Sequence, residues 1–114
     1  MHEVGIAQNL IEQVEKRLSQ IGESIQALKI YIQLGKLAGV SPEALRFGFE
    51  VAKQNSRIAF AQIEIKEIPI RLSCPGCKEE FEAETQMTNC PLCGTEAVRV
   101  LTGRELLIDS LEYE

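Results

Sequence analysis

The sequence predicts an α+β fold in which a small mixed sheet packs with two helices and a short cysteine-bearing segment is inserted into the chain. Three observations predict it: apolar residues at helical spacing near the start, strict alternation of apolar and polar residues further on, and four cysteines confined to residues 74–93. The chain has 114 residues, the size of one ordinary domain or of a small domain carrying a smaller insertion.

The first helix and the first strand follow from two different periodicities. From Ala7 to Ile21 the apolar residues recur every three or four positions, and Gly22 can end the helix. Apolar and polar residues then alternate over residues 28–34 until Gly35, which is the pattern of a strand with one buried face.

A second helix is predicted by its starting residues. Ser41, Pro42 and Glu43 supply an N-cap, a first-turn proline and an early acid, so we expect a helix that runs to about Asn55. Its inward face should consist of Leu45, Phe49 and Ala52.

The remaining strands surround the cysteines. One begins at Ile63, and its alternation slips by one position and continues to Leu72, with Pro69 marking an edge or a bulge. Residues 98–101 and 106–111 should be strands that return to the first unit across a turn at Thr102 and Gly103. We therefore expect an α/β domain of residues 1–72 and 98–114, and a domain of residues 73–97 inserted into a strand pair.

All four cysteines stand in two matching hooks separated by twelve residues, Cys74-Pro75-Gly76-Cys77 and Cys90-Pro91-Leu92-Cys93. Two such turns place four sulfurs at the corners of a tetrahedron, which is the geometry of closed structural zinc sites. Gly94 follows the last cysteine, where a turn can require positive φ. A segment this short and polar should fold only around its metal, so we predict a four-cysteine zinc ribbon.

Two other interpretations of the cysteines were weighed. Two disulfides would suit a secreted scaffold, but the chain has the composition of a cytosolic protein. Iron can occupy a similar four-sulfur cage, but an electron carrier needs little else, whereas most of this chain lies outside the hooks.

The only histidine is His2, between Met1 and Glu3, so any site that needs an imidazole must form at the amino terminus. The α-amine, the His2 amide and the imidazole can chelate one ion in fused rings, and planar nitrogen sites favour Ni(II) or Cu(II) over zinc. Glu3, water or a partner could supply the fourth ligand. The alternative is an ordinary frayed terminus, because chain ends are usually disordered unless they are tied down.

Composition and charge exclude several classes of function. The net charge of −5 is unsuited to nucleic acid, and an acidic cluster at residues 78–84 reads as a solvated edge. No apolar stretch approaches the roughly twenty residues of a membrane span, and no signal peptide is evident, so we expect a cytoplasmic protein. One histidine at position two cannot build a catalytic triad, so we expect no enzyme activity and no catalytic residue.

Four parts of the sequence together resemble the HypA/HybF family of nickel metallochaperones, accessory proteins for the maturation of nickel-iron hydrogenase. They are the opening Met1-His2-Glu3, the stretch over residues 34–47 (LGKLAGVSPEALRF), the two cysteine hooks, and residues 103–108 (GRELLI). The resemblance covers nearly the whole chain in the right order.

The resemblance implies an α/β domain that binds Ni(II) through His2 and neighbouring atoms, with Met1 and Glu3 as candidates, and a separate zinc domain whose ligands are the four cysteines. It also implies a carrier that hands nickel to the large subunit of hydrogenase in concert with a GTPase partner, to which the hydrolysis belongs. A homodimer is a further expectation. Some family members have additional histidines near the hooks or the carboxyl end, and this chain has none.

Two other classes of function stay open at this stage. A zinc ribbon that binds nucleic acid or polymerase would require a basic stripe or stacking aromatics, whereas this ribbon is acidic. A purely structural zinc adaptor with an inert terminus would keep the fold and lose only the nickel.

Overall fold

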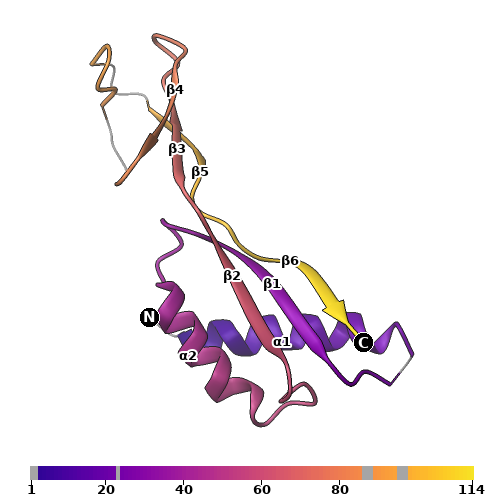
Figure 1. The fold of residues 1–114 in the computed structure, drawn as a ribbon. Helices are drawn as coiled ribbons and strands as arrows, with labels where there is room; N and C mark the ends of the chain where they lie inside the picture. Colours follow the sequence, from indigo (N-terminus) through magenta and orange to yellow (C-terminus); the bar gives the residue numbers. More distant parts are fainter. Residues whose placement is uncertain (1–2, 23, 86–88, 95–97) are drawn as a thin grey trace.

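The computed structural model describes residues 3–22, 24–85, 89–94 and 98–114. The chain forms an elongated molecule of 56 × 26 × 16 Å in which two three-stranded sheets follow one another (Figure 1). In chain order the elements are α1 (Glu3–Ser19), β1 (Leu28–Gly35), α2 (Pro42–Lys53), β2 (Gln62–Ile68), β3 (Ile70–Ser73), β4 (Glu80–Ala83), β5 (Arg99–Thr102) and β6 (Leu106–Tyr113).

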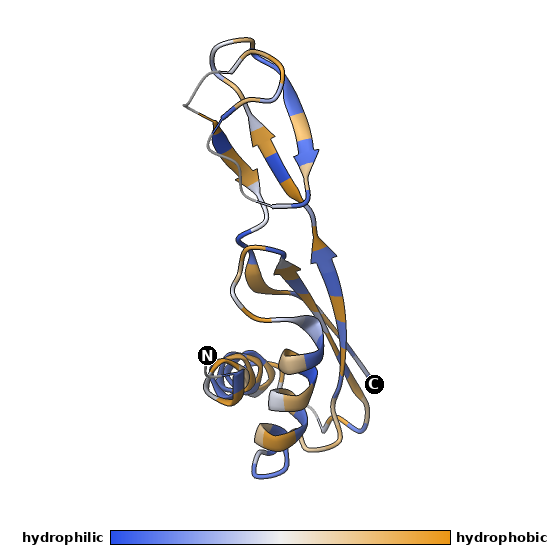
Figure 2. Cartoon of the chain, turned by 90° about the vertical axis from the view of Figure 1, so that its left-hand side faces the viewer, coloured by the Kyte–Doolittle hydropathy of each residue, from blue (hydrophilic) through white to orange (hydrophobic). Residues whose placement is uncertain are grey.

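The first sheet has the strand order β2-β1-β6 and is mixed, as predicted. β1 and β2 are parallel and are connected through α2, and β6 runs antiparallel on the other side of β1. Figure 2 shows both helices on the same side of this sheet. The α/β unit, residues 3–68 and 103–114, is therefore two layers, one of helices and one of strands.

The core of the α/β unit lies between those two layers. Alternate residues of β1 are buried against the helices, and α1 contributes the apolar face that its periodicity predicted. Burying one such aliphatic side chain contributes about 1.5–3 kcal/mol. The buried members from these elements are Ala7, Leu10, Ile11, Val14, Leu28, Ile30, Ile32, Leu34, Leu45, Phe49 and Ile108.

The start of α2 follows the predicted pattern. The Ser41 hydroxyl accepts a hydrogen bond from the Ala44 amide (3.1 Å), and Pro42 is the first helical residue. Leu45 and Phe49 are buried, and Ala52 packs against the core. The helix ends at Lys53, slightly before the expected residue 55.

The expectation of one slipped strand from Ile63 to Leu72 is wrong. The chain forms two strands, β2 and β3, which belong to different sheets and are separated at Pro69. Proline has no amide hydrogen to donate to a ladder, which favours a break in pairing there. The Pro69 carbonyl instead accepts a hydrogen bond from the Thr102 hydroxyl (2.8 Å).

Strand β5 also differs from expectation, because it pairs with β3 in the second sheet, of order β4-β3-β5, and does not return to the first unit. The strands that flank this segment, β2 and β6, pair with opposite sides of β1 and not with each other. We call residues 70–102 the ribbon unit. Whether it folds independently stays a prediction.

Backbones cross closely at the point where the chain leaves the α/β unit for the ribbon unit and returns from it. The Gly35 amide donates to the Glu105 carbonyl and the Leu37 amide to the Gly103 carbonyl, both at 2.6 Å, and the Lys36 amide donates to the Ile68 carbonyl at 3.1 Å. The end of β1 therefore holds both connecting segments. A Cβ at Gly35 would collide with the Gly103 carbonyl group, which explains why this position carries no side chain.

Replacing Gly35 with alanine should destabilise the protein. The new Cβ would collide with the Gly103 carbonyl group and the Arg104 nitrogen, which are backbone atoms and cannot swing away as a flexible side chain can. Overpacking of this kind typically costs about 1–3 kcal/mol. Chemical denaturation monitored by circular dichroism would measure the loss. The matched control is Gly5→Ala at an exposed position of α1, which should raise stability by up to about 1 kcal/mol. Equal stabilities for the two variants would contradict the close crossing.

Candidate metal centres

The two cysteine hooks have the same backbone geometry. The first follows directly from β3, and the Lys78 amide donates to the Cys74 carbonyl (2.7 Å). In the second, the Gly94 amide donates to the Cys90 carbonyl (2.9 Å). Gly94 has the predicted positive φ of 77°, and Lys78 at the equivalent position has a φ of 62°. The sequence did not reveal the left-handed backbone conformation of Lys78, since a lysine gives no sign of it.

The structure brings the four sulfurs of Cys74, Cys77, Cys90 and Cys93 together, all within 4.8 Å of one another. We call them the sulfur cluster. The Sγ atoms of Cys74 and Cys93 are 3.4 Å apart, and those of Cys77 and Cys90 are 3.8 Å apart. Four sulfurs around a tetrahedral zinc, with Zn–S bonds of about 2.3 Å, would be separated by about 3.8 Å. The cluster thus fits Zn(II), and its cysteines are free thiols, not disulfides.

Burial differs across the sulfur cluster. Cys74 and Cys90 are buried, Cys77 is half-buried and Cys93 is exposed, so one side of the cluster faces solvent. Next to the hooks, Leu72 of β3 pairs with Phe81 of β4 on one side and is buried. This register places two apolar residues side by side next to the hooks.

Thiol protonation is the main electrostatic feature of the metal-free cluster. A hydrogen bond from the Glu79 backbone lowers the pKa of Cys77, but desolvation and hydrogen bonds with the other three thiols outweigh it. Together they raise the pKa of Cys77 to about 12. An incoming cation must therefore displace a proton from this sulfur.

The acidic cluster at residues 78–84 lies on β4 and the turn before it. Arg71 of β3 lies between two of its carboxylates, with N–O distances of 3.8 Å to Glu80 and 3.7 Å to Glu82. Both carboxylates remain largely exposed. The expected solvated edge is confirmed for the described residues of this strand.

Of the three candidate nickel ligands, only Glu3 belongs to the described residues; Met1 and His2 lie outside them. Glu3 is the first residue of α1 and is half-buried. Its peptide bond to Val4 packs directly on Gly48 of α2: a Cβ at Gly48 would lie 2.6 Å from the Glu3 carbonyl oxygen and 3.1 Å from the Val4 nitrogen. The start of α1 is thus held against the middle of α2.

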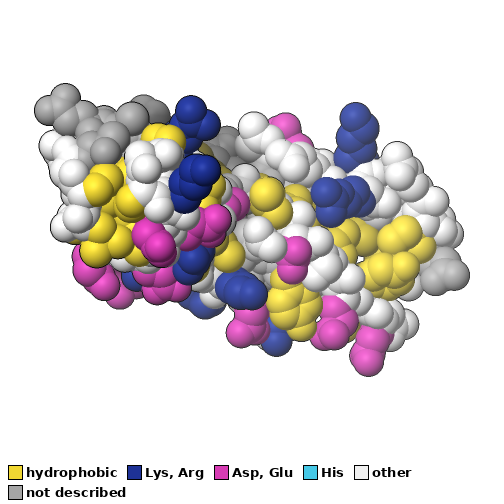
Figure 3. Space-filling model, turned by 90° about the horizontal axis from the view of Figure 1, so that it is seen from above, with side chains coloured by type: hydrophobic (Ala, Val, Ile, Leu, Met, Phe, Trp, Pro, Cys, Tyr) yellow, Lys and Arg dark blue, Asp and Glu magenta, His cyan; other side chains and the backbone are white. Residues whose placement is uncertain are grey.

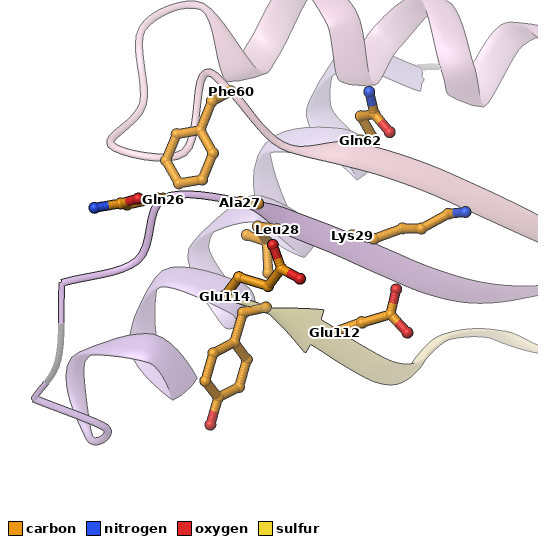
Figure 4. Close-up of a pocket in the computed structure, with 9 residues that line it drawn as sticks. Gln26, Ala27, Leu28, Lys29, Phe60, Gln62, Glu112 and Glu114 are labelled. Carbon is orange, nitrogen blue, oxygen red and sulfur yellow. The ribbon is translucent and has the colours of Figure 1, made fainter.

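Other hollows offer no comparable donor set. One hollow, of about 530 Å³, lies at the end of the first sheet (Figure 4), where Lys29 of β1 pairs in register with Glu112 of β6 and Phe60 comes from the loop before β2. Lys29 is engaged by Glu64 at 2.9 Å. Among the described residues, the sulfur cluster is the one group of three or more histidine, cysteine or carboxylate side chains close enough to share an ion.

A two-layer α/β unit joined to a four-sulfur ribbon defines a small metal-binding protein in which the start of α1 packs against α2. The family model described as hydrogenase/urease nickel incorporation metallochaperone, HypA, matches residues 1–113. The chain therefore belongs to the HypA family of nickel-incorporation metallochaperones, as the resemblance predicted.

Individual relatives agree over the full length. The chain is 36% identical over 115 residues to the hydrogenase maturation factor HypA of Roseiflexus sp. (strain RS-1), covering 100% of this chain and 93% of that protein. It is 37% identical over 114 residues to that of Geobacter sulfurreducens, covering 100% of both. These identities support family membership independently of the structure.

Two solved structures share the fold. A solution structure of HypA protein has a TM-score of 0.72 and 21% identity, covering 100% of this chain and 97% of that one. The solution structure of the Ni metallochaperone HypA from Helicobacter pylori has a TM-score of 0.68 and 22% identity, covering 99% and 97%.

The alternative of a nucleic-acid-binding ribbon is not favoured. The family match includes the ribbon unit. On the face seen from above (Figure 3), basic side chains lie among acidic and hydrophobic ones and do not form a continuous stripe across the described residues.

In the described part of the chain, no helix is long and apolar enough to span a membrane.

Zinc binding should weaken as the pH falls. With its pKa raised to about 12 in the metal-free cluster, Cys77 keeps its proton below that pH, and acid favours the protonated thiol over the metal-bound thiolate. This thiol alone should reduce the apparent zinc affinity by about tenfold for each pH unit of acidification. Competition with a chromogenic chelator between about pH 8 and pH 6 would measure it, with the chelator and zinc alone as control. An affinity that stays constant over this range would contradict the prediction.

Proposed function

We propose that this protein delivers Ni(II) to the large subunit of nickel-iron hydrogenase during maturation, with a structural zinc in the ribbon unit. The observation that carries the proposal is the family match over residues 1–113. Relatives at 36% and 37% identity over the whole chain are hydrogenase maturation factors. The sulfur cluster supplies the predicted second metal site.

The proposed nickel site is the amino terminus. The α-amine of Met1 and the amide and imidazole nitrogens of His2 form a chelate, and Glu3, water or a partner completes it. Because α1 begins at Glu3, the first backbone amides of the helix have no acceptor within it and are free for other uses. The positive end of the helix dipole also favours a negatively charged amide nitrogen there.

The two proposed metal sites suit opposite tasks. An exposed terminal chelate can lose its ligands one at a time as an acceptor replaces them, which suits transfer. A closed four-thiolate cage retains its ion and stabilises the ribbon unit. We propose Cys74, Cys77, Cys90 and Cys93 as the zinc ligands and assign the protein no reaction of its own.

The proposed function includes an acceptor, a partner protein and a cellular compartment. The hydrogenase large subunit is the acceptor, and a GTPase maturation partner supplies the hydrolysis. The protein acts in the cytoplasm, where a reducing environment keeps thiols available for metal. Membership of a family of hydrogenase and urease nickel-incorporation metallochaperones supports these assignments.

Replacing His2 with alanine should weaken Ni(II) binding by about tenfold or more, because one ligand of the chelate is lost. Isothermal titration of untagged, zinc-loaded protein would measure this, and adding one residue before Met1 should have a similar effect. Gln8→Ala on the exposed side of α1 is the control and should bind as the unchanged chain does. If His2→Ala retains full affinity, the terminal chelate is wrong.

Replacing Cys74 with serine should release zinc and unfold the ribbon unit while both helices persist. The ribbon unit has few buried apolar side chains, whereas the helices belong to the separate core of the α/β unit. Metal analysis and amide NMR spectra would show both effects, and the neighbouring Ser73→Ala is the control. Loss of the helices together with the zinc would argue against two folding units.

A further inference from the structure

Two apolar side chains on α2 face away from the core. Phe47 is 63% exposed and Val51 is 41% exposed, whereas Leu45 and Phe49 on the other side of the same helix are buried. Residues four apart lie next to each other on a helix, so Phe47 and Val51 form one surface. We call this pair the α2 patch.

The α2 patch lies close to the start of α1. A Cβ at Gly48, which stands between Phe47 and Val51 in the sequence, would lie 2.6 Å from the Glu3 carbonyl oxygen and 3.1 Å from the Val4 nitrogen. Glu3 is one residue from His2. Figure 1 likewise shows the start of α1 next to α2. A protein that touches the α2 patch would therefore stand next to the proposed nickel chelate.

Charge around the α2 patch suggests the chemistry of its partner. The residues three and four positions from Phe47 on the helix surface are Glu43, Ala44, Glu50 and Val51, two of them carboxylates. Arg46 donates to the Ile63 carbonyl (3.4 Å), away from the patch. Lys53 pairs with Glu50 (3.0 Å) and donates to the Ala61 carbonyl, so it partly neutralises Glu50. Glu43 forms no ion pair among the described contacts. An apolar side chain flanked by basic residues would complement this surface.

The size of the α2 patch argues for a transient partner. A stable protein interface buries about 800 Å² on each side, far more than two partly exposed side chains can supply. A permanent dimer of this chain through the α2 patch is therefore disfavoured. A carrier must release its acceptor after transfer, and a small anchor surface is compatible with fast dissociation.

We propose that the α2 patch docks the protein that receives nickel, through an apolar side chain of that acceptor flanked by lysine or arginine. This inference rests on the proposed function, and it names the surface that the acceptor uses. Phe47 is the anchor, Val51 extends it, and Glu43, which forms no ion pair among the described contacts, provides the charge. Docking there brings the acceptor to the amino terminus without using any nickel ligand.

The test uses the full-length zinc-loaded chain and the purified nickel-free precursor of the hydrogenase large subunit from the same organism. Phe47→Ala and Val51→Ala retain helix propensity, and Phe60→Ala is the control, since Phe60 is 45% exposed but lies in the loop before β2. We expect Phe47→Ala to weaken precursor binding tenfold or more in surface plasmon resonance, as removal of an anchor side chain does. Phe60→Ala should bind within twofold of the unchanged chain.

A charge reversal tests the acidic surround. Glu43→Lys should weaken binding of the same precursor, and the loss should diminish at high salt. Glu84→Lys alters the net charge equally but lies in the ribbon unit, so it is the matched control and should have a smaller effect. The Ni(II) affinity of every variant should stay within twofold of the unchanged chain, because none of these residues is a proposed ligand.

The outcomes separate this inference from the proposed function. Unchanged precursor binding by Phe47→Ala, or an equal loss in Phe60→Ala, would overturn the docking surface while His2-dependent nickel binding survived. The docking surface would also be overturned if the unchanged chain did not bind the precursor at all. The same holds if Phe47→Ala weakened binding only to the GTPase partner, or if it changed only the self-association of the chain in analytical ultracentrifugation. If nickel binding does not depend on His2, the terminal chelate itself fails, whatever the α2 patch binds.

Discussion

The meeting of four sulfurs is the constraint on which the ribbon unit depends. Among the described residues, its buried apolar side chains are few: Ile70 and Leu72 of β3, together with the buried cysteines Cys74 and Cys90. A segment with so little apolar surface does not offset the loss of its chain entropy without an additional bond. The four sulfurs bring the end of β3 next to a hook that follows β4 in the sequence, and a metal ion shared among them would supply that bond. We therefore expect metal binding and folding to be coupled in this part of the molecule.

The crossing at Gly35 gives the two units a defined connection. Both segments that lead into and out of the ribbon unit are hydrogen-bonded to the end of β1, at Ile68 and at Gly103 with Glu105. Since the same strand β1 lies at the centre of the first sheet, the ribbon unit is attached to the core and not to a free loop. The two proposed metal sites would in this way be carried on one framework.

Helix α2 packs against both the hydrophobic core and the start of α1. Its inward face closes the hydrophobic core, Gly48 holds the start of α1, and Phe47 and Val51 face solvent. One short helix can therefore support both the start of α1 and the proposed docking surface. If the amino terminus is the nickel site, docking on α2 would hold the acceptor close to it during ligand exchange.

The sequence by itself determined what depends on local patterns. The alternation over residues 28–34 specifies β1, Ser41 with Pro42 specifies the start of α2, and the spacing of the cysteines specifies two hooks. Each signal is complete within a few residues, because propensity, capping and turn chemistry act over one or two turns of chain. The family resemblance added the order of these signals along nearly the whole chain, which the family match confirms.

Only the tertiary structure decided features that depend on distant partners. β3 and β5 carry alternating patterns that would fit either sheet, and their pairing in the ribbon unit follows from contacts across about thirty residues. The close approaches at Gly35 and Gly48, and the positive φ of Lys78, have no local sign because the group that excludes or permits a side chain lies elsewhere in the chain. Local sequence specified the elements, and packing between remote backbones specified where they meet.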